Sequence, residues 1–244
     1  NLVVTDSATL VLAGNTIITA EELVVAEGAA ISADGQGYEP ANGPGSGENG
    51  SWTYDCGGGG GYGGSGGEGY NYGGAPFAGG APYGDIYQPD ELGSGGGNGH
   101  YLPWGQYGGA GGGSIHLIVN GTLMLSGTIS ANGDAGQVDF YGGGGGGSGG
   151  SVWIEANELL GAPAGSITPT IRAGGGNGGG SKQGSGGGGS GGRIAIYAEA
   201  SSFDGTIQVS GGAGHEDGQA GTVYLGGIDP VSSTVVASPV AGVV

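Results

Sequence analysis

Apolar residues alternate with polar or small residues in several short runs of this chain. In "SVWIEA", Val152 and Ile154 fall on one face of an extended segment, and Trp153 and Glu155 fall on the other. The run "RIAIYA", which begins at Arg193, repeats this alternation. Strands this short are unstable alone, so we expect them to stack on one another.

Two motifs recur in a fixed order along the chain. The first motif, Ile-x-Ala-x-Gly, begins at Ile31, Ile129 and Ile171, and a looser copy begins at Ile207. The second, a strand-like run, begins at Ser114, Ser151, Arg193 and Thr222. It returns roughly every 30 to 40 residues, which is the range of solenoid repeats.

The first 37 residues repeat faster than the rest. Apolar runs begin at Leu2, Thr9, Thr16, Leu23 and Ala29, and turn-forming residues separate them. A strand about every seven residues, joined by tight corners, predicts a parallel β-helix with about three faces per turn. Helix formers are sparse, so we expect an all-β fold without an α-helix.

Glycine supplies 70 of the 244 residues, and much of it lies in tracts just before the second motif. The tracts span 108–113, 142–150 and 186–192. A flexible linker is one interpretation. Their recurrence at the same step of the repeat favours another, in which glycine adopts polyproline II helices that pack backbone to backbone. The predicted fold is therefore a β-helix or solenoid with packed polyproline II helices (polyglycine II) alongside.

The combination "GTISANG…GGGGGGSGGSVWIEA…GGGGSGGRIAIYA" resembles the glycine-rich repeats of very large secreted or surface proteins of environmental bacteria. The resemblance covers about residues 105–227, and it implies adhesin-like or structural material at the cell surface. Packed polyglycine helices of some phage tail-tip adhesins, and of a glycine-rich antifreeze protein, are similar in architecture. That similarity implies no shared activity.

The repeats and tracts divide the chain into four parts. We expect N-terminal rungs over 1–37, a Gly/Tyr-rich insertion over 38–113, solenoid repeats over 114–230 and an apolar arm over 231–244. The four parts are expected to form one continuous domain.

The charge balance excludes several partners. The chain has 21 acidic and 3 basic side chains, a net charge of −18, which argues against nucleic acid and anionic membrane surfaces. No apolar run is long enough to span a bilayer. With the single cysteine Cys56, no internal disulfide can form. We interpret the chain as a mature protein or an excised domain that is extracellular or displayed on a cell surface.

Most of the 12 tyrosines lie in the insertion. Aromatic side chains on a glycine framework offer large contact area with few rotatable bonds, which suits sugar rings or a protein partner. Packing onto the glycine layer is the alternative. The candidate contact residues are Trp52, Tyr54, Tyr62, Tyr70, Tyr72, Tyr83, Tyr87, Tyr101, Trp104 and Tyr107.

Metal binding and catalysis have less support. Asp134 and Asp139 could bind Ca²⁺, and "GGAGHEDG", with Glu216 and Asp217, is similar to a single calcium-binding nonapeptide; surface solvation is the alternative for these carboxylates. Many β-helices act on polysaccharides, but lyase chemistry needs a basic group beside a calcium-bound acid. With only three basic residues, we expect no enzyme and keep a polysaccharide-active enzyme as a remote alternative.

The apolar arm suggests assembly. It could cap the fold, or it could add a strand to a neighbouring copy, and a contact of that kind that does not close makes a filament. The expected assembly residues are Val231, Val235, Val236, Val240 and Val243. We therefore expect a secreted structural protein that polymerises head to tail into a fibre or surface layer. The alternative is an adhesin whose aromatic insertion binds glycans, a partner protein or neighbouring cells.

Overall fold

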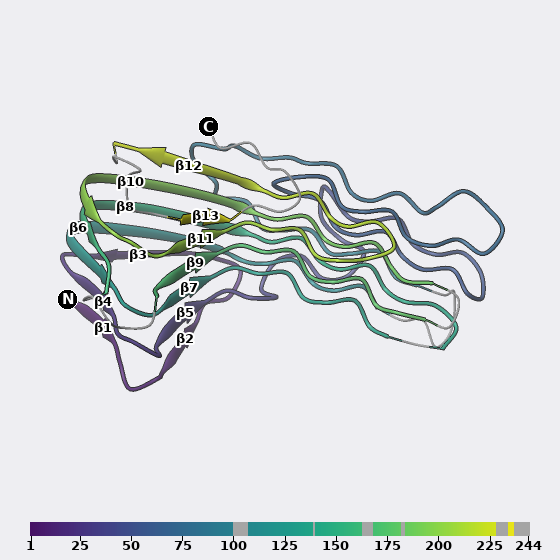
Figure 1. The fold of residues 1–244 in the computed structure, drawn as a ribbon, viewed down its shortest axis with the longest axis horizontal. Helices are drawn as coiled ribbons and strands as arrows, with labels where there is room; N and C mark the ends of the chain where they lie inside the picture. Colours follow the sequence, from purple (N-terminus) through teal and green to yellow (C-terminus); the bar gives the residue numbers. More distant parts are fainter. Residues whose placement is uncertain (100–106, 139, 163–167, 182–183, 228–233, 237–244) are drawn as a thin grey trace.

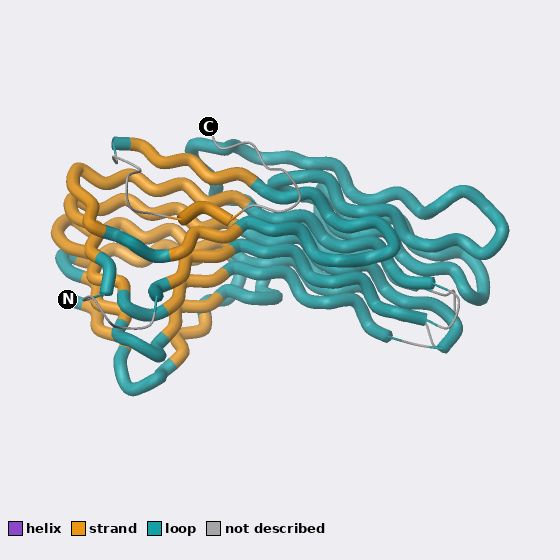
Figure 2. Tube along the Cα trace, viewed as in Figure 1, coloured by secondary structure: helices purple, strands orange, loops and turns teal. Residues whose placement is uncertain are grey.

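The computed structural model describes residues 1–99, 107–138, 140–162, 168–181, 184–227 and 234–236. These residues form two lobes that lie end to end (Figure 1). One lobe holds all the described strands, and the other consists of long glycine-rich segments that run side by side (Figure 2). The described residues include no helix, and therefore none that could cross a membrane.

Seven strands of the first lobe form one parallel sheet, which we call sheet A. The hydrogen-bonded order is β1-β4-β6-β8-β10-β12, and β3 also pairs with β6. The bounds are β1 Leu2–Val4, β3 Asn15–Ala20, β4 Leu23–Val25, β6 Ser114–Leu125, β8 Ser151–Leu160, β10 Arg193–Ser202 and β12 Thr222–Gly226.

The other six strands form a second parallel sheet, sheet B, in the order β13-β11-β9-β7-β5-β2. The chain passes from sheet A to sheet B and back, because each strand of sheet B follows a strand of sheet A in sequence. The bounds are β2 Thr9–Val11, β5 Ala30–Ser32, β7 Thr128–Ser130, β9 Thr170–Arg172, β11 Thr206–Gln208 and β13 Thr234–Val236.

Equivalent residues of the repeats lie in register. The isoleucines of the first motif form one column of sheet B, in which Ile31 pairs with Ile129, Ile129 with Ile171 and Ile171 with Ile207. All four are buried. In sheet A, the inward residues of β6, β8, β10 and β12 are likewise buried, among them Ile115, Val152, Ile194 and Val223. The core therefore lies between the sheets and is built from the alternation seen in the sequence.

Two details differ from the sequence-based expectation. The described strands fall into two sheets, so the expectation of three faces per turn is wrong. Three of the four second-motif strands, β6, β8 and β10, are also longer than predicted. β6 spans 12 residues, and the two short N-terminal strands β3 and β4 pair with its two halves. The short spacing of apolar runs in the N-terminal region therefore arises in part because β3 and β4 together occupy the place of one long strand beside β6.

The glycine tracts are ordered by hydrogen bonds between neighbouring segments. Within 142–150, amides three residues apart donate to the same neighbour, with N···O distances of 2.8–3.0 Å. The acceptors lie in three segments, 131–137, 94–97 and 187–190. Carbonyl groups of the same tract accept from three further segments, around 57–60, 109–112 and 176–179. The tract is thus bonded on all sides, which excludes a flexible linker in this structure.

The predicted insertion is part of the same lobe. Its segment 57–63 donates to residues of 45–48 and 143–146, and its carbonyls accept from Gly97, Gly187 and Ser190. Segments far apart in the sequence therefore build one bundle. We call this lobe the glycine bundle.

A polar junction joins the glycine bundle to the strand lobe. Arg193, at the start of β10, is 6% exposed, and its guanidinium donates to the carbonyl of Tyr83 from Nε (3.0 Å) and Nη2 (2.7 Å). It lies 5.3 Å from the ring centroid of Tyr62, whose hydroxyl forms a 2.6 Å hydrogen bond with Ser151. Burial lowers the pKa of Arg193. The junction fixes the bundle at the starts of β8 and β10.

Candidate functional site

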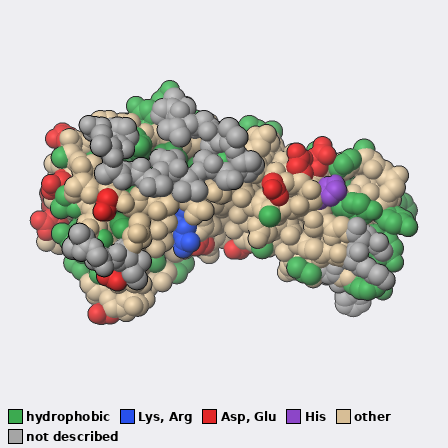
Figure 3. Space-filling model, in the orientation of Figure 1, with side chains coloured by type: hydrophobic (Ala, Val, Ile, Leu, Met, Phe, Trp, Pro, Cys, Tyr) green, Lys and Arg blue, Asp and Glu red, His purple; other side chains and the backbone are tan. Residues whose placement is uncertain are grey.

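An aromatic cluster lies at the end of the glycine bundle farthest from the sheets. The 142–150 tract leads into β8, so its first residues mark the far end, and Gly57 donates to Gly143 there. The turns beside these two positions, 51–56 and 140–141, carry aromatic side chains. Exposed hydrophobic side chains gather at this end of the molecule (Figure 3). We call the cluster of Trp52, Tyr54, Tyr72, Phe140 and Tyr141 the aromatic tip.

Ring contacts join four members of the aromatic tip, and the fifth, Trp52, lies in the same turn as Tyr54. The ring of Tyr54 lies 5.6 Å from that of Tyr72 and 5.9 Å from that of Tyr141, centroid to centroid. Phe140 meets Tyr141 edge to face at 5.0 Å. Aromatic pairs at such distances are mutually stabilising. Three separate turns of the chain are therefore combined into one surface.

The Asp55 carboxylate organises this surface from below. It is 3% exposed and accepts hydrogen bonds from the N–H groups of Ser51 (3.0 Å) and Trp52 (2.8 Å) through Oδ2. Its Oδ1 accepts from the N–H of Tyr72 at 3.3 Å. Tyr54 has φ of 77°, a left-handed conformation that costs energy in a non-glycine residue. The turn is therefore held in one geometry before any partner arrives.

The aromatic tip is exposed despite these contacts. Trp52 is 79% exposed and Tyr72 61%, and Phe140 and Tyr141 are each about half exposed. Its own carboxylate, Asp55, is buried and already bonded to backbone N–H groups. The described residues of the tip thus offer ring faces and tyrosine hydroxyls to a partner.

The thiol of Cys56 lies behind the tip and is buried. Its Sγ accepts a hydrogen bond from the N–H of Gly143 at 3.3 Å, and burial raises its pKa. We assign this thiol to the packing of the bundle.

The structure separates the predicted contact residues into groups. Tyr54 and Tyr72 meet at the tip, and Trp52 lies in the same turn as Tyr54, where its N–H donates to Asp55. Tyr62 is fully buried at the junction, and Tyr83, beside it at 4.8 Å, donates to the carbonyl of Leu92. A ligand cannot reach Tyr62 in this structure, so its predicted contact role is corrected to packing.

The remaining predicted residues are scattered. Tyr70 packs edge-on against His215, Tyr87 against Tyr224 on sheet A, and Tyr107 lines a hollow of about 530 Å³ with Asp134 and Gln137. Tyr101 and Trp104 lie outside the described residues.

Phe140 and Tyr141 were missed by sequence reasoning. They lie after the "ISANG" motif and outside the insertion, at the start of a glycine tract. Tracts 57–63 and 142–150 lie side by side in the same direction, so the residues just before the two tracts lie at the same end of the bundle. A parallel pairing of the two tracts would therefore have placed Phe140 and Tyr141 beside the aromatic residues of the insertion.

The calcium candidates are placed as follows. Glu216 Oε2 accepts from the N–H of Glu68 at 3.0 Å, and Asp217 Oδ1 accepts from that of Gly214 at 3.1 Å, so both carboxylates serve turns of the bundle. Burial, followed by the charges of Asp34 and Glu39, raises the pKa of Asp134. Asp139 lies outside the described residues. Within the described part of the chain, no three acidic, histidine or cysteine side chains group closely enough to hold a metal ion.

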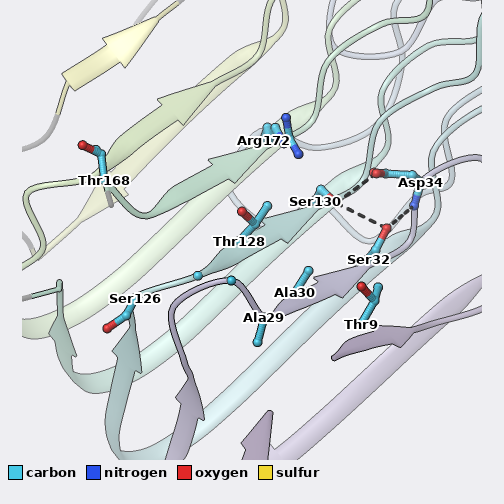
Figure 4. A pocket seen from close by; sticks show the side chains of 12 residues that line it. Thr9, Ala29, Ala30, Ser32, Asp34, Ser126, Thr128, Ser130, Thr168 and Arg172 are labelled. Carbon is cyan, nitrogen blue, oxygen red and sulfur yellow. Dashed lines mark hydrogen bonds between the residues drawn. The ribbon is translucent and has the colours of Figure 1, made fainter. Parts of the chain in front are cut away.

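A polar hollow of about 280 Å³ lies against sheet B (Figure 4). The Ser130 hydroxyl donates to Asp34 at 3.0 Å and lies 3.3 Å from the hydroxyl of Ser32, and Asp34 also accepts from the N–H of Asn132 at 2.6 Å. Ser32, Asp34 and Ser130 thus bond to one another, and Thr9, Thr128 and Arg172 also line the hollow.

The predicted assembly residues fall mostly outside the described part of the chain. Val235 and Val236 belong to β13, which pairs in parallel with β11 of the same chain. Val231, Val240 and Val243 lie outside the described residues.

No family model, curated protein or solved structure matches this chain. The function is therefore argued from the site itself.

Proposed function

We propose that this chain is an extracellular adhesion module that binds a protein surface through its aromatic tip. In this proposal the two sheets form a β-solenoid body, and the tracts are polyproline II helices packed into a stiff arm. The three-residue period of the hydrogen bonds supports the helices, since polyproline II has three residues per turn. The acidic composition, with a net charge of −18, suits a soluble module displayed outside the cell.

The carrying observation is a rigid, exposed aromatic cluster at the end of an elongated bundle. Tryptophan and tyrosine dominate the energetic centres of protein interfaces, and a fixed arrangement lowers the entropy lost on binding. Trp52 and Tyr72 are the most exposed of the group. A protein partner fits better than a glycan, because the carboxylate of Asp55 is occupied by backbone N–H groups and cannot receive sugar hydroxyls.

Binding of the labelled full chain to a panel of bacterial and animal cells tests this proposal. We expect binding to at least one cell type, abolished when the cells are treated with protease and retained after periodate oxidation of their glycans. Trp52→Ala should reduce the affinity at least about tenfold, as expected for an interface centre. The control Val11→Ala removes a side chain that is 63% exposed in β2, in the other lobe, and should change nothing.

Three results would refute the proposal. Binding that survives protease, is lost after periodate and is abolished by Trp52→Ala would assign the tip to glycans. Binding to no cell type, or equal binding by Trp52→Ala and the unmodified chain, would remove the adhesive role.

A structural subunit of a fibre or surface layer is a second candidate. One observation favours it: among the described strands, β1, β2 and β3 each pair on one side only. An open parallel edge can accept a strand from another copy. Negative-stain electron microscopy of the full chain should then show polymers, and deletion of residues 231–244 should abolish them. A monodisperse monomer at high concentration would exclude this candidate.

A further inference from the structure

A groove of about 510 Å³ crosses four strands of sheet A, in the lobe opposite the aromatic tip. Its lining comes from the middle of β6, β8 and β10 and from the last residues of β12. Ile118, Glu155 and Tyr197 lie in register across three of these strands. Their neighbours Leu117, Ile154 and Ile196 are buried in the core, so the groove lies on the face that points away from it.

Two tyrosines form an aromatic wall in the groove. The rings of Tyr197 and Tyr224 lie 5.5 Å apart, centroid to centroid. Tyr87 packs edge to face on Tyr224 at 4.8 Å, and its carbonyl accepts a 2.8 Å hydrogen bond from the Tyr197 hydroxyl. The two rings are therefore fixed from outside the groove, and ordering them on binding costs little.

Acceptors and amides lie beside this wall. Glu155 presents a side chain that is 43% exposed, and its Oε1 lies 2.8 Å from Nε2 of His116, which stacks on Trp153 at 3.8 Å. Exposed Glu199 and Asn157 line the same groove. One carboxylate is thus held in place by its neighbours, and a second reaches into solvent.

We propose that this groove binds a neutral oligosaccharide. Sugar rings present C–H faces to the tyrosines, and their hydroxyls donate to Glu155 and Glu199. The described lining residues include both carboxylates and no lysine or arginine, so a uronic or sulfated polymer would meet unpaired like charge. Four parallel strands span about 14 Å, which suits a chain of several sugar units better than one.

Isothermal titration of the full chain with soluble hexasaccharides tests the inference. The probes are cellohexaose, laminarihexaose, mannohexaose and the anionic hexagalacturonate. At least one neutral probe is expected to bind with a dissociation constant below about 1 mM, and hexagalacturonate at least about tenfold more weakly. Tyr224→Ala should weaken the neutral probe at least about tenfold, whereas Tyr224→Phe, which keeps the ring, should remain within about threefold.

A second variant, which should gain binding to the anionic probe, keeps the inference testable if Tyr224→Ala fails to fold. Glu199 is exposed, so Glu199→Lys should leave the melting temperature unchanged and strengthen the binding of hexagalacturonate. Trp52→Ala, at the aromatic tip, should still bind the neutral probe. This variant therefore distinguishes a failure of the groove inference from a failure of the proposed adhesive role of the tip. The inference is overturned if no neutral probe binds, if hexagalacturonate binds the unmodified chain best, or if a folded Tyr224→Ala binds as well as the unmodified chain.

Discussion

Replacing Gly146 by alanine would test whether the glycines are a packing surface. A Cβ at this position would lie 1.9 Å from the carbonyl oxygen of Gly176, whereas ordinary contacts begin at 3.4 Å. One of the two segments must therefore move by about 1.5 Å, which is well beyond the small adjustments that close-packed interiors allow.

The magnitude follows from the hydrogen bonds at that point. Gly146 donates to Gly187 at 2.9 Å and accepts from Gly60 at 2.8 Å, and Gly176 donates to Gly147 at 2.8 Å. A shift of about 1.5 Å takes such bonds out of range, at about 1 kcal/mol each, with a further penalty for buried groups left without partners. The lower chain entropy of alanine in the unfolded state returns about 0.4–1 kcal/mol. We expect a net destabilisation of about 2–4 kcal/mol.

Gly180→Ala is the matched control. A Cβ added to this glycine would meet no heavy atom within 4 Å, and its φ is not left-handed. The control should therefore leave the free energy of unfolding unchanged or raise it by up to about 1 kcal/mol. Urea denaturation followed by circular dichroism measures both variants. Equal stability of Gly146→Ala and Gly180→Ala would refute the packing argument.

Three further predictions concern buried charge and the junction. Burial raises the pKa of Asp134 above 3.8, so the carboxyl group stabilises the fold fully below that pH, and this stabilisation is lost as the pH rises through the folded-state pKa. Asp134→Asn should therefore raise the melting temperature at about pH 7 and leave it unchanged at about pH 3. The reverse pattern would contradict this. Burial raises the pKa of Tyr62 from 10.0 to about 12, so the fold should lose stability above pH 10.0. An ultraviolet phenolate titration should show tyrosines that ionise well above pH 10.0, and titration of every tyrosine near 10.0 would contradict this. Arg193→Lys should destabilise the fold by about 2–3 kcal/mol in urea denaturation, because one ammonium cannot replace the donors to Tyr83 and Thr222, and a variant as stable as the unmodified chain would contradict this.

Repeat spacing and alternation were enough to predict the parallel all-β core. The column of Ile31, Ile129, Ile171 and Ile207 follows directly from the Ile-x-Ala-x-Gly motif, because equivalent residues of stacked repeats must lie in register. Alternation also identified the inward faces of Val152 and Ile154. The number of sheets could not be predicted, because alternation fixes the face of a residue within a strand and carries no information on where the chain turns.

The fate of each aromatic residue was harder to predict. Tyr62 and Trp52 both lie in glycine-rich sequence, yet one is fully buried and the other 79% exposed. The difference arises from distant partners, since Tyr62 meets Ser151 and Arg193 at the junction, whereas Trp52 lies in a turn closed by Asp55. Local sequence could not specify either environment, because both depend on how segments of the bundle align.

Amide hydrogen exchange over residues 142–150, resolved by residue with nuclear magnetic resonance, tests the ordered glycine bundle most directly. These amides donate to three neighbouring segments. We predict exchange slowed to the rate of the β8 amides, since both should open only with the fold as a whole. Exchange of the tract at random-coil rates, with β8 still protected, would contradict the account.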